Sequence, residues 1–174
     1  MSHVLPSLDP AYRQLLPQLK NAALSIGVTL TARQETQLLY YLQQLLFWNK
    51  AYNLTAIKDQ QSALVKHIFD SLSIIPYLPD GNLLDIGTGA GLPAVIIAIC
   101  QPSRTVTALD SNQKKIRFHQ QYFYLNLNTC YLSGQIHPLQ NHWQNKIVLL
   151  FHQKEYFCLL PAFCYQCLLQ DPFP

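Results

Sequence analysis

The stretch Asp85-Ile86-Gly87-Thr88-Gly89-Ala90-Gly91 decides how the middle of this 174-residue chain folds. It follows a short apolar run at 83–86, which is typical of a buried strand, and it precedes the apolar stretch 92–100. Glycines allow positive φ angles and let the backbone approach a ligand closely. The sequence therefore predicts a strand, a ligand-binding glycine turn and a helix, which together begin a βαβ unit.

A second strand and a second helix follow this turn. The β-branched run 105–109 ends at Asp110, which lies 19 residues after Gly91, and Ser111 is placed to cap the helix that carries Lys114. This order of elements predicts an α/β fold with a Rossmann-like, doubly wound and mainly parallel sheet. Ligands of such sheets bind at the carboxyl ends of the strands. We therefore expect Asp110 and the glycine turn to share one site.

The glycine spacing and the neighbouring charge indicate which ligand binds. NAD-binding turns follow the pattern G-x-G-x-x-G, which seats a pyrophosphate on a helix N-terminus, whereas this chain has G-x-G-x-G. The Asp85 carboxylate would repel a phosphate and attract a cation. S-adenosylmethionine is cationic, lacks phosphate, and has ribose hydroxyls that an acid can bind. We expect this cofactor to be held by Asp85, Gly87, Gly89, Gly91, Asp110 and Ser111, and an NAD-dependent oxidoreductase is the less favoured alternative.

The first third of the chain has helical patterns. An apolar face from Leu15 to Ile26 predicts a helix that ends at Gly27. Thr31 and Gln34 match a capping box, which predicts a second helix from about 32 to about 48, followed by a loop at 49–55. Asp59 is placed to cap a third helix, and the Pro- and Gly-containing stretch 76–81 predicts a boundary after it.

Charge is distributed unevenly along the sequence. Charged residues make up 12% of the chain and apolar residues 49%, yet residues 118–174 carry only Lys146, Lys154, Glu155 and Asp171. Beyond about 127 only 147–151 has a strand-like pattern, and the remaining length predicts a sheet smaller than the usual five or six strands. Two interpretations remain open, an unusually buried C-terminal half and a tail that was not selected for this fold, as after a frameshift.

Several segments together resemble a known family. They are WNKAYNLT at 48–55, HIFDSL at 67–72, DIGTGAGLP at 85–93, LDS at 109–111 and KKIRF at 114–118. In order and spacing, from about Leu38 to about Leu127, they are similar to the bacterial small-subunit ribosomal RNA methyltransferase G family, also called glucose-inhibited division protein B. This resemblance implies a class I S-adenosylmethionine-dependent methyltransferase fold preceded by N-terminal helices. It also implies methyl transfer to N7 of a guanine in 16S ribosomal RNA.

The resemblance also implies a division of the chain and roles for its residues. We expect an N-terminal helical segment at 1–78 and a methyltransferase domain at 79–174 that is incomplete after about 128. Gly87 and Leu92 would contact S-adenosylmethionine and Asp110 its ribose. The residues expected near the pocket mouth are Asn53, Thr55, His67 and Asp70. The family's Ser-Arg-x-Glu segment, which reaches the adenine, has no match in Ser133-Gly134-Gln135-Ile136-His137-Pro138.

Methylation of guanine N7 requires no proton transfer by the protein. The lone pair of N7 lies in the ring plane, so no general base is needed. The rate depends on aligning N7 with the methyl group and on excluding water. The product is cationic, and we expect Asp70 to stabilise it, with His67 and Asn53 as further catalytic candidates. Lys50, Lys114, Lys115 and Arg117 are the expected contacts to RNA phosphates. A non-catalytic remnant of such an enzyme is the alternative.

Net charge, cysteine content and hydropathy give weaker constraints on the function. The net charge of +3 is compatible with nucleic-acid binding. A single pair, Cys164 and Cys167, does not make a zinc site, so no metal is expected. No apolar run reaches the roughly 18 residues of a transmembrane helix, and the first 20 residues lack a signal-peptide core. We expect a cytoplasmic monomer that binds 16S ribosomal RNA, alone or in the 30S subunit, and no membrane.

Overall fold

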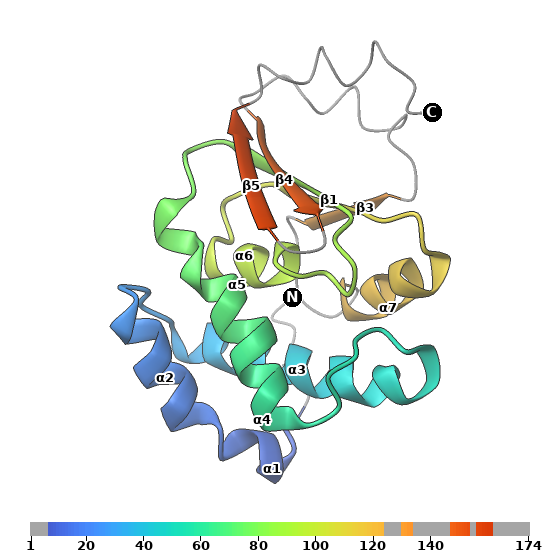
Figure 1. Ribbon diagram of the computed structural model, residues 1–174. Helices are drawn as coiled ribbons and strands as arrows, with labels where there is room; N and C mark the ends of the chain where they lie inside the picture. The colour runs from blue at the N-terminus through green and yellow to red at the C-terminus, as the bar shows by residue number, and fades with distance from the viewer. Residues whose placement is uncertain (1–6, 124–129, 134–146, 154–155, 162–174) are drawn as a thin grey trace, which may run out of the picture.

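Helices and a sheet form successive layers in the computed structural model (Figure 1), which describes residues 7–123, 130–133, 147–153 and 156–161. The N-terminal helical elements are α1 (Pro10–Arg13), α2 (Leu16–Ser25), α3 (Ala32–Tyr52), α4 (Gln60–Ala63), the π-helix η1 (Leu64–Phe69), α5 (Asp70–Ser73) and the 3-10 helix η2 (Ile75–Tyr77). The alternating part follows as β1 (Asn82–Ile86), α6 (Ala94–Cys100), β2 (Val106–Leu109), α7 (Gln113–Phe123), β3 (Cys130–Ser133), β4 (Ile147–Gln153) and β5 (Tyr156–Pro161).

The sheet has the order β3-β2-β1-β4-β5. Strands β3, β2, β1 and β4 run parallel, and β5 is antiparallel to β4. The predicted α/β fold with a mainly parallel sheet is confirmed. The prediction of fewer than five strands is wrong, because β4 and β5 form a hairpin and a hairpin uses far fewer residues than two strand–helix units.

The register of β1 and β2 places the two predicted ligand-binding segments together. Ile86 pairs with Leu109, so both strands end at the same edge of the sheet. Gly87 follows β1 there and Asp110 follows β2. The backbone N–H of Gly87 donates to the Leu109 carbonyl at 2.8 Å, which fixes the start of the glycine loop on β2.

The long helix α3 confirms its predicted start and corrects its predicted end. Thr31 and Gln34 form the capping box. The helix continues four residues beyond Trp48, to Tyr52, and ends at Asn53 in the left-handed conformation with φ 50°. Asparagine tolerates this conformation better than other non-glycine residues. The predicted loop at 49–55 therefore begins only at Asn53.

The third predicted helix exists, but it is interrupted. Asp59 caps α4 as expected, because its Oδ1 accepts from the Ser62 N–H at 2.7 Å. The helix then widens into the π-helix η1 before α5. A π-helical segment of this kind is often found at functional sites, and it carries His67.

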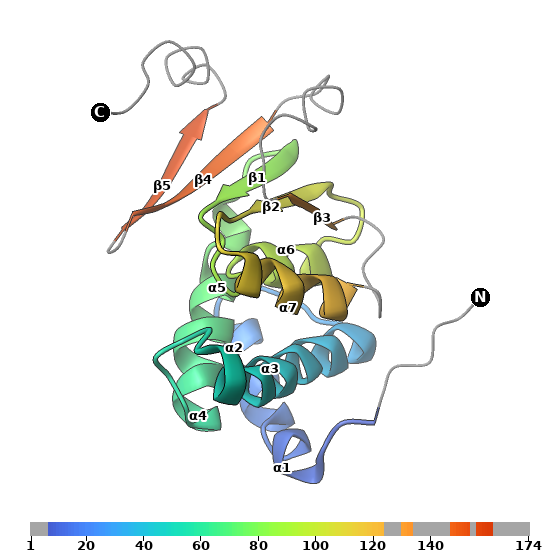
Figure 2. The ribbon, with the colours of Figure 1, turned by 90° about the vertical axis from the view of Figure 1, so that its right-hand side faces the viewer.

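One apolar core joins the N-terminal helices to the α/β part. Leu38, Leu42 and Leu45 of α3 are fully buried in a cluster that also contains Ile96 of α6 and Phe118 of α7. Figure 2 shows α6 and α7 between the sheet and α3. The division at residue 78 stays a prediction, and this core crosses it. No helix in the described ranges is long and apolar enough to cross a membrane.

Candidate active site

The glycine loop adopts an unusual backbone conformation. Gly87, Gly89 and Gly91 have φ angles of 79°, 62° and 95°, a region that side chains other than glycine rarely adopt. A Cβ atom on Gly91 would overlap the His119 ring and lie 2.6 Å from Val95 Cγ2. Gly91 is therefore required both by its backbone angle and by the close packing of α6 and α7.

Asp85 is a completely buried carboxylate at the end of β1. Its Oδ2 accepts a hydrogen bond of 2.6 Å from the Thr88 hydroxyl, whereas its Oδ1 has no hydrogen-bond partner among the described residues. Burial raises the pKa of Asp85 to about 7, although the Thr88 hydroxyl and the nearby backbone N–H of Ala94 oppose the shift. A buried acceptor without a partner is costly. The site thus suits a ligand that brings a donor or a positive charge.

Asp110 connects three parts of the site through one carboxylate. Its Oδ2 accepts from the Gly89 N–H at 2.8 Å, and its Oδ1 accepts from the Asn112 N–H at 2.8 Å. Lys115 Nζ lies 3.8 Å from Asp110 Oδ2. The carboxylate therefore fixes the glycine loop to the end of β2 and to the beginning of α7.

The predicted cap of α7 requires a correction. Asn112 caps the helix in place of Ser111, because Asn112 Oδ1 accepts from the Lys114 N–H at 3.0 Å. Ser111 is exposed beside Asp110. The two residues are both common capping types, and the bond from the Asn112 N–H to Asp110 selects the second.

Two buried side chains that sequence reasoning missed also hold the glycine loop. His119 of α7 places Nε2 2.9 Å from the Gly89 carbonyl oxygen. Burial lowers the pKa of His119 to about 4, so the ring is neutral at pH 7 and its Nε2–H donates to that carbonyl. Tyr41 of α3 donates its hydroxyl to the Ala90 carbonyl at 2.8 Å. Neither contact leaves a local sequence signal, because each joins residues at least 30 positions apart.

The segments 48–55 and 67–72 meet at the C-terminus of α3. Buried Asn49 accepts from the Thr55 N–H at 2.9 Å and donates to the Ile57 carbonyl at 3.2 Å. Thr55 Oγ1 lies 2.9 Å from His67 Nε2. Burial lowers the pKa of His67. The structure thus brings Thr55 and His67 together, and Asn49 is a further residue that shapes this loop.

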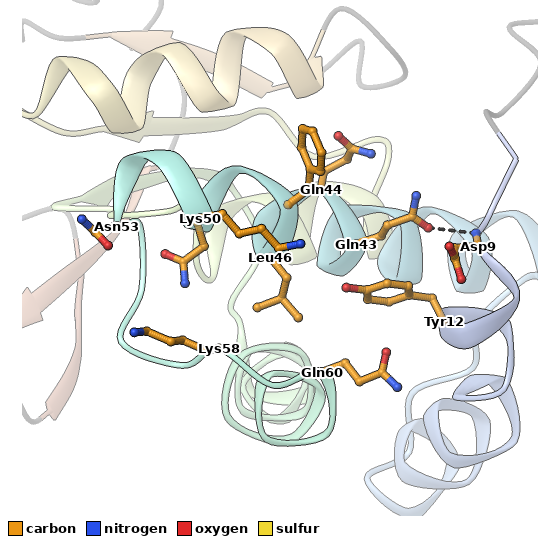
Figure 3. A pocket seen from close by; sticks show the side chains of 11 residues that line it. Asp9, Tyr12, Gln43, Gln44, Leu46, Lys50, Asn53, Lys58 and Gln60 are labelled. Carbon is orange, nitrogen blue, oxygen red and sulfur yellow. Dashed lines mark hydrogen bonds between the residues drawn. The ribbon is translucent and has the colours of Figure 1, made fainter.

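The other predicted residues lie on separate surfaces. Exposed Asp70 lines a hollow of about 270 Å³ together with residues of α2, including Ala22 and Ser25. Lys50 and Asn53 line a larger pocket of about 840 Å³ beside α3 (Figure 3). The remaining basic candidates are on α7, where Lys114 and Arg117 are exposed and Lys115 is half-buried near Asp110.

The described part of the chain contains no group of three or more His, Cys, Asp or Glu side chains that could hold a metal ion. Cys164 and Cys167 lie outside the described residues, as does most of the segment 133–138 in which the family's Ser-Arg-x-Glu pattern is missing.

A mainly parallel sheet whose glycine loop meets a buried acid and a second acid at adjacent strand ends is typical of an α/β protein, and these residues form a candidate small-molecule site. Residues 34–150 match the family model described as rRNA small subunit methyltransferase G. The chain belongs to this family. The resemblance in the sequence is confirmed, and membership of a methyltransferase family decides against the NAD-dependent oxidoreductase.

Similar proteins from two bacterial genera each carry the name ribosomal RNA small subunit methyltransferase G. The protein from Psychrobacter arcticus is 66% identical over 110 residues, which are 61% of this chain and 46% of that protein. The protein from Psychrobacter sp. strain PRwf-1 is 58% identical over 110 residues (63% and 49%), and one from Acinetobacter baumannii is 53% identical over 105 residues (60% and 50%). The chain spans about half the length of the curated relatives it matches.

Proposed function

We propose that the chain binds S-adenosylmethionine at the glycine loop and transfers its methyl group to N7 of a guanine in 16S ribosomal RNA, using a class I methyltransferase fold. The observation that carries the proposal is the buried Asp85 carboxylate, whose Oδ1 has no hydrogen-bond partner in the described part of the chain. The ammonium of this cofactor would supply the missing donor and charge. The relatives' printed names supply the class of RNA.

The residues around Asp85 fit the rest of the cofactor. At Gly89 no side chain lies closer than 3.9 Å to the place of a Cβ, so a ligand can approach this backbone, whereas Gly91 packs against His119 and Val95. Gly87 precedes them and Leu92 follows at the loop's end. Asp110 accepts two N–H bonds, yet a carboxylate offers about four lone-pair positions. Lys115 Nζ lies 3.8 Å from Oδ2, and the carboxylate keeps further positions that would accept from ribose hydroxyls, with exposed Ser111 beside it.

The chemistry asks the protein for alignment rather than for proton transfer. When bound, S-adenosylmethionine supplies an electrophilic methyl group. The chain's task is to hold guanine N7 in line with that group and to exclude water. The rigid loop, fixed by His119 and Tyr41, provides one side of this alignment. Lys114 and Arg117 on α7 and Lys50 on α3 are the proposed phosphate contacts, and Lys115 lies closer to Asp110.

The roles of Asp70, His67 and Asn53 in catalysis stay predictions. His67 bonds to Thr55 in the loop after α3, so it is well placed to fix that loop. Asp70 lies among residues of α2. An Asp70→Asn chain that binds cofactor and RNA normally and keeps full turnover would remove Asp70 from the mechanism.

Calorimetry with the full chain tests the cofactor. We expect S-adenosylmethionine to bind, NAD to give no heat, and Asp85→Asn to weaken S-adenosylmethionine binding at least tenfold. Asp80→Asn is the matched control, because Asp80 is an exposed acid just before β1. Equal affinity of the Asp85→Asn and wild-type chains for S-adenosylmethionine would refute the site.

Transfer of a tritiated methyl group to 16S ribosomal RNA, and to 30S subunits, tests the activity. Label at guanine N7 supports the full proposal. Binding of S-adenosylmethionine without any transfer would favour the second candidate, a cofactor-binding chain without catalysis. The near absence of charged side chains in residues 118–174 is the observation behind that second candidate.

A further inference from the structure

A polar pocket of about 840 Å³ lies beside α3, outside the candidate active site (Figure 3). Its walls come from α1 and the residue before it, from α3, from the segment between α3 and α4, and from the first residue of α4. This volume is in the range of small-molecule sites, about 300–1,000 Å³. We call it the α3 pocket.

The α3 pocket and the glycine loop lie on opposite faces of one helix. Tyr41 points to the glycine loop, where its hydroxyl bonds to the Ala90 carbonyl. Gln43 and Lys50, which line the pocket, follow Tyr41 by two and nine positions. At about 100° per residue they project roughly 200° and 180° away from Tyr41. A single nucleotide therefore cannot occupy the α3 pocket and meet the glycine loop at once.

Charge is separated along the α3 pocket. Lys58 lies at one end and Asp9 at the other, and the Lys50 side chain extends towards the middle (Figure 3). Neither lysine forms an ion pair with a residue that the structure describes. Asp9 is already engaged, because its Oδ1 accepts from the Ala11 N–H at 2.8 Å and caps α1. The lysine end is thus suited to a phosphate.

The rest of the lining combines amides with aromatic rings. The Tyr12 ring lies between the side chains of Gln43 and Gln60 (Figure 3). Gln43 accepts from the Asp9 N–H at 2.9 Å, which leaves its amide hydrogens as donors. Phe47 lines the pocket with 65% of its surface exposed. Amides hydrogen-bond to base edges, and aromatic rings stack on bases, as in single-stranded RNA recognition.

We propose that the α3 pocket binds one nucleotide of a single-stranded RNA segment, with its phosphate at Lys50 and Lys58 and its base against the aromatic and amide end. Because α3 separates the two sites, this nucleotide differs from the one that is methylated. The proposal rests on the proposed function in one respect, that RNA is the substrate. An acidic peptide would satisfy the lysines but would leave the stacking surface unused, so RNA is the favoured occupant.

The test measures RNA binding without methylation. A fluorescent single-stranded oligoribonucleotide is titrated with the full chain at several salt concentrations. We expect Lys58→Gln to weaken binding about threefold to tenfold and to reduce the salt slope by about 0.7, the value for one lost phosphate contact to a single strand. Lys66→Gln is the matched control, because Lys66 is an exposed lysine on η1 outside the pocket lining, and it should retain wild-type affinity.

Aromatic variants test the base end of the α3 pocket. We expect Phe47→Ala to weaken RNA binding about tenfold, the loss of one stacked base. Tyr77→Ala should change nothing, because Tyr77 is 77% exposed on η2, away from the pocket. Crosslinking with a 4-thiouridine RNA should label peptides from α1 or α3.

The result separates this proposal from the cofactor site. Weaker RNA binding by Lys58→Gln and Phe47→Ala, with S-adenosylmethionine binding unchanged, supports the α3 pocket whether or not methyl transfer is seen. Wild-type RNA affinity in both variants overturns it, even if the chain is an active methyltransferase. Displacement of RNA by polyglutamate at equal charge concentration would also overturn it in favour of an acidic partner.

Discussion

The glycine loop and the α3 pocket use opposite faces of α3, yet they are built differently. The loop is fixed by buried groups, since Asp110, His119 and Tyr41 each bond to its backbone. The α3 pocket is lined mostly by partly or fully exposed side chains, such as Phe47 and Lys58. A loop backbone fixed in this way suits a small ligand whose hydrogen-bonding atoms have fixed positions. The α3 pocket suits a polymer whose bases and phosphates adjust to long, mobile side chains.

This contrast predicts that the glycine loop tolerates substitution much less well than the α3 pocket does. We expect Gly91→Ala to lower the stability of the fold more than any other change considered. The Cβ would require a strained φ of 95° and would collide with His119 and Val95. Strain and overpacking each cost about 1–3 kcal/mol, so we expect the free energy of unfolding in urea to fall by about 2–6 kcal/mol. Gly27→Ala is the control, with φ 76° and open space around its Cβ. Similar losses for the two variants would contradict a tightly packed loop.

His119 should make the loop sensitive to acid. Its pKa of about 4 lies below the ordinary 6.5, so the stability it contributes is present above pH 6.5 and is lost as the pH falls towards 4. Asp85, with its pKa raised from 3.8 to about 7, acts in the opposite direction, since the stability it contributes is lost as the pH rises. His119→Gln keeps a donor but does not titrate. Relative to wild type, it should gain about 2 kcal/mol between pH 7 and pH 5.

Urea titrations of both chains at the two pH values measure this difference. A difference that does not change with pH would show that the His119 ring titrates alike in the folded and unfolded chains. The α3 pocket provides the comparison, because Lys58→Gln alters a group that stays charged across this range and should show no such change.

Cofactor binding should depend on pH through Asp85. Its pKa of about 7 in the free chain means that binding of a cation is accompanied by loss of a proton. Affinity for S-adenosylmethionine should therefore rise about tenfold from pH 6 to pH 8 and level off above. Calorimetry in buffers of different ionisation enthalpy measures the proton released. Asp85→Asn should release none, and a flat wild-type profile would contradict the assignment of the cation to Asp85.

The smallest effect on stability belongs to the α3 pocket itself. Phe47→Ala removes a ring that is 65% exposed, and exposed substitutions usually change stability by less than about 0.5 kcal/mol. Thermal unfolding should show this variant to be close to wild type, despite the expected loss of RNA affinity. A loss of more than about 1 kcal/mol would show that Phe47 is a structural residue.

Local rules predicted much of the fold. The Thr31–Gln34 capping box, the Asp59 cap and the acid at the end of each central strand all depend on neighbours in sequence. The end of α3 was missed because Asn53 closes the helix through its left-handed backbone, and no glycine or proline marks that point. The β4–β5 hairpin was missed because an apolar run does not reveal which way the next strand turns.

The candidate site was predictable in its chemistry but only partly in its supports. Asp85, Asp110 and the glycines were found because their types and spacing are characteristic of a strand-end ligand site. Tyr41 and His119 were not found, since their hydrogen bonds span 49 and 30 residues. The contacts of Tyr41 and His119 depend on how α3 and α7 pack against the loop, and the order of residues along the chain does not reveal that packing.

The bond from Tyr41 to the Ala90 carbonyl links α3 to the loop through the shared core. If α3 detaches from the core, the loop loses one of its supports, so the amides of both segments should exchange with solvent in a single cooperative opening. A ligand at the glycine loop should then slow exchange along α3 as well. Gln43 and Lys50 belong to that helix. A ligand at the glycine loop would therefore make opening of the α3 pocket's main wall rarer without contacting that pocket.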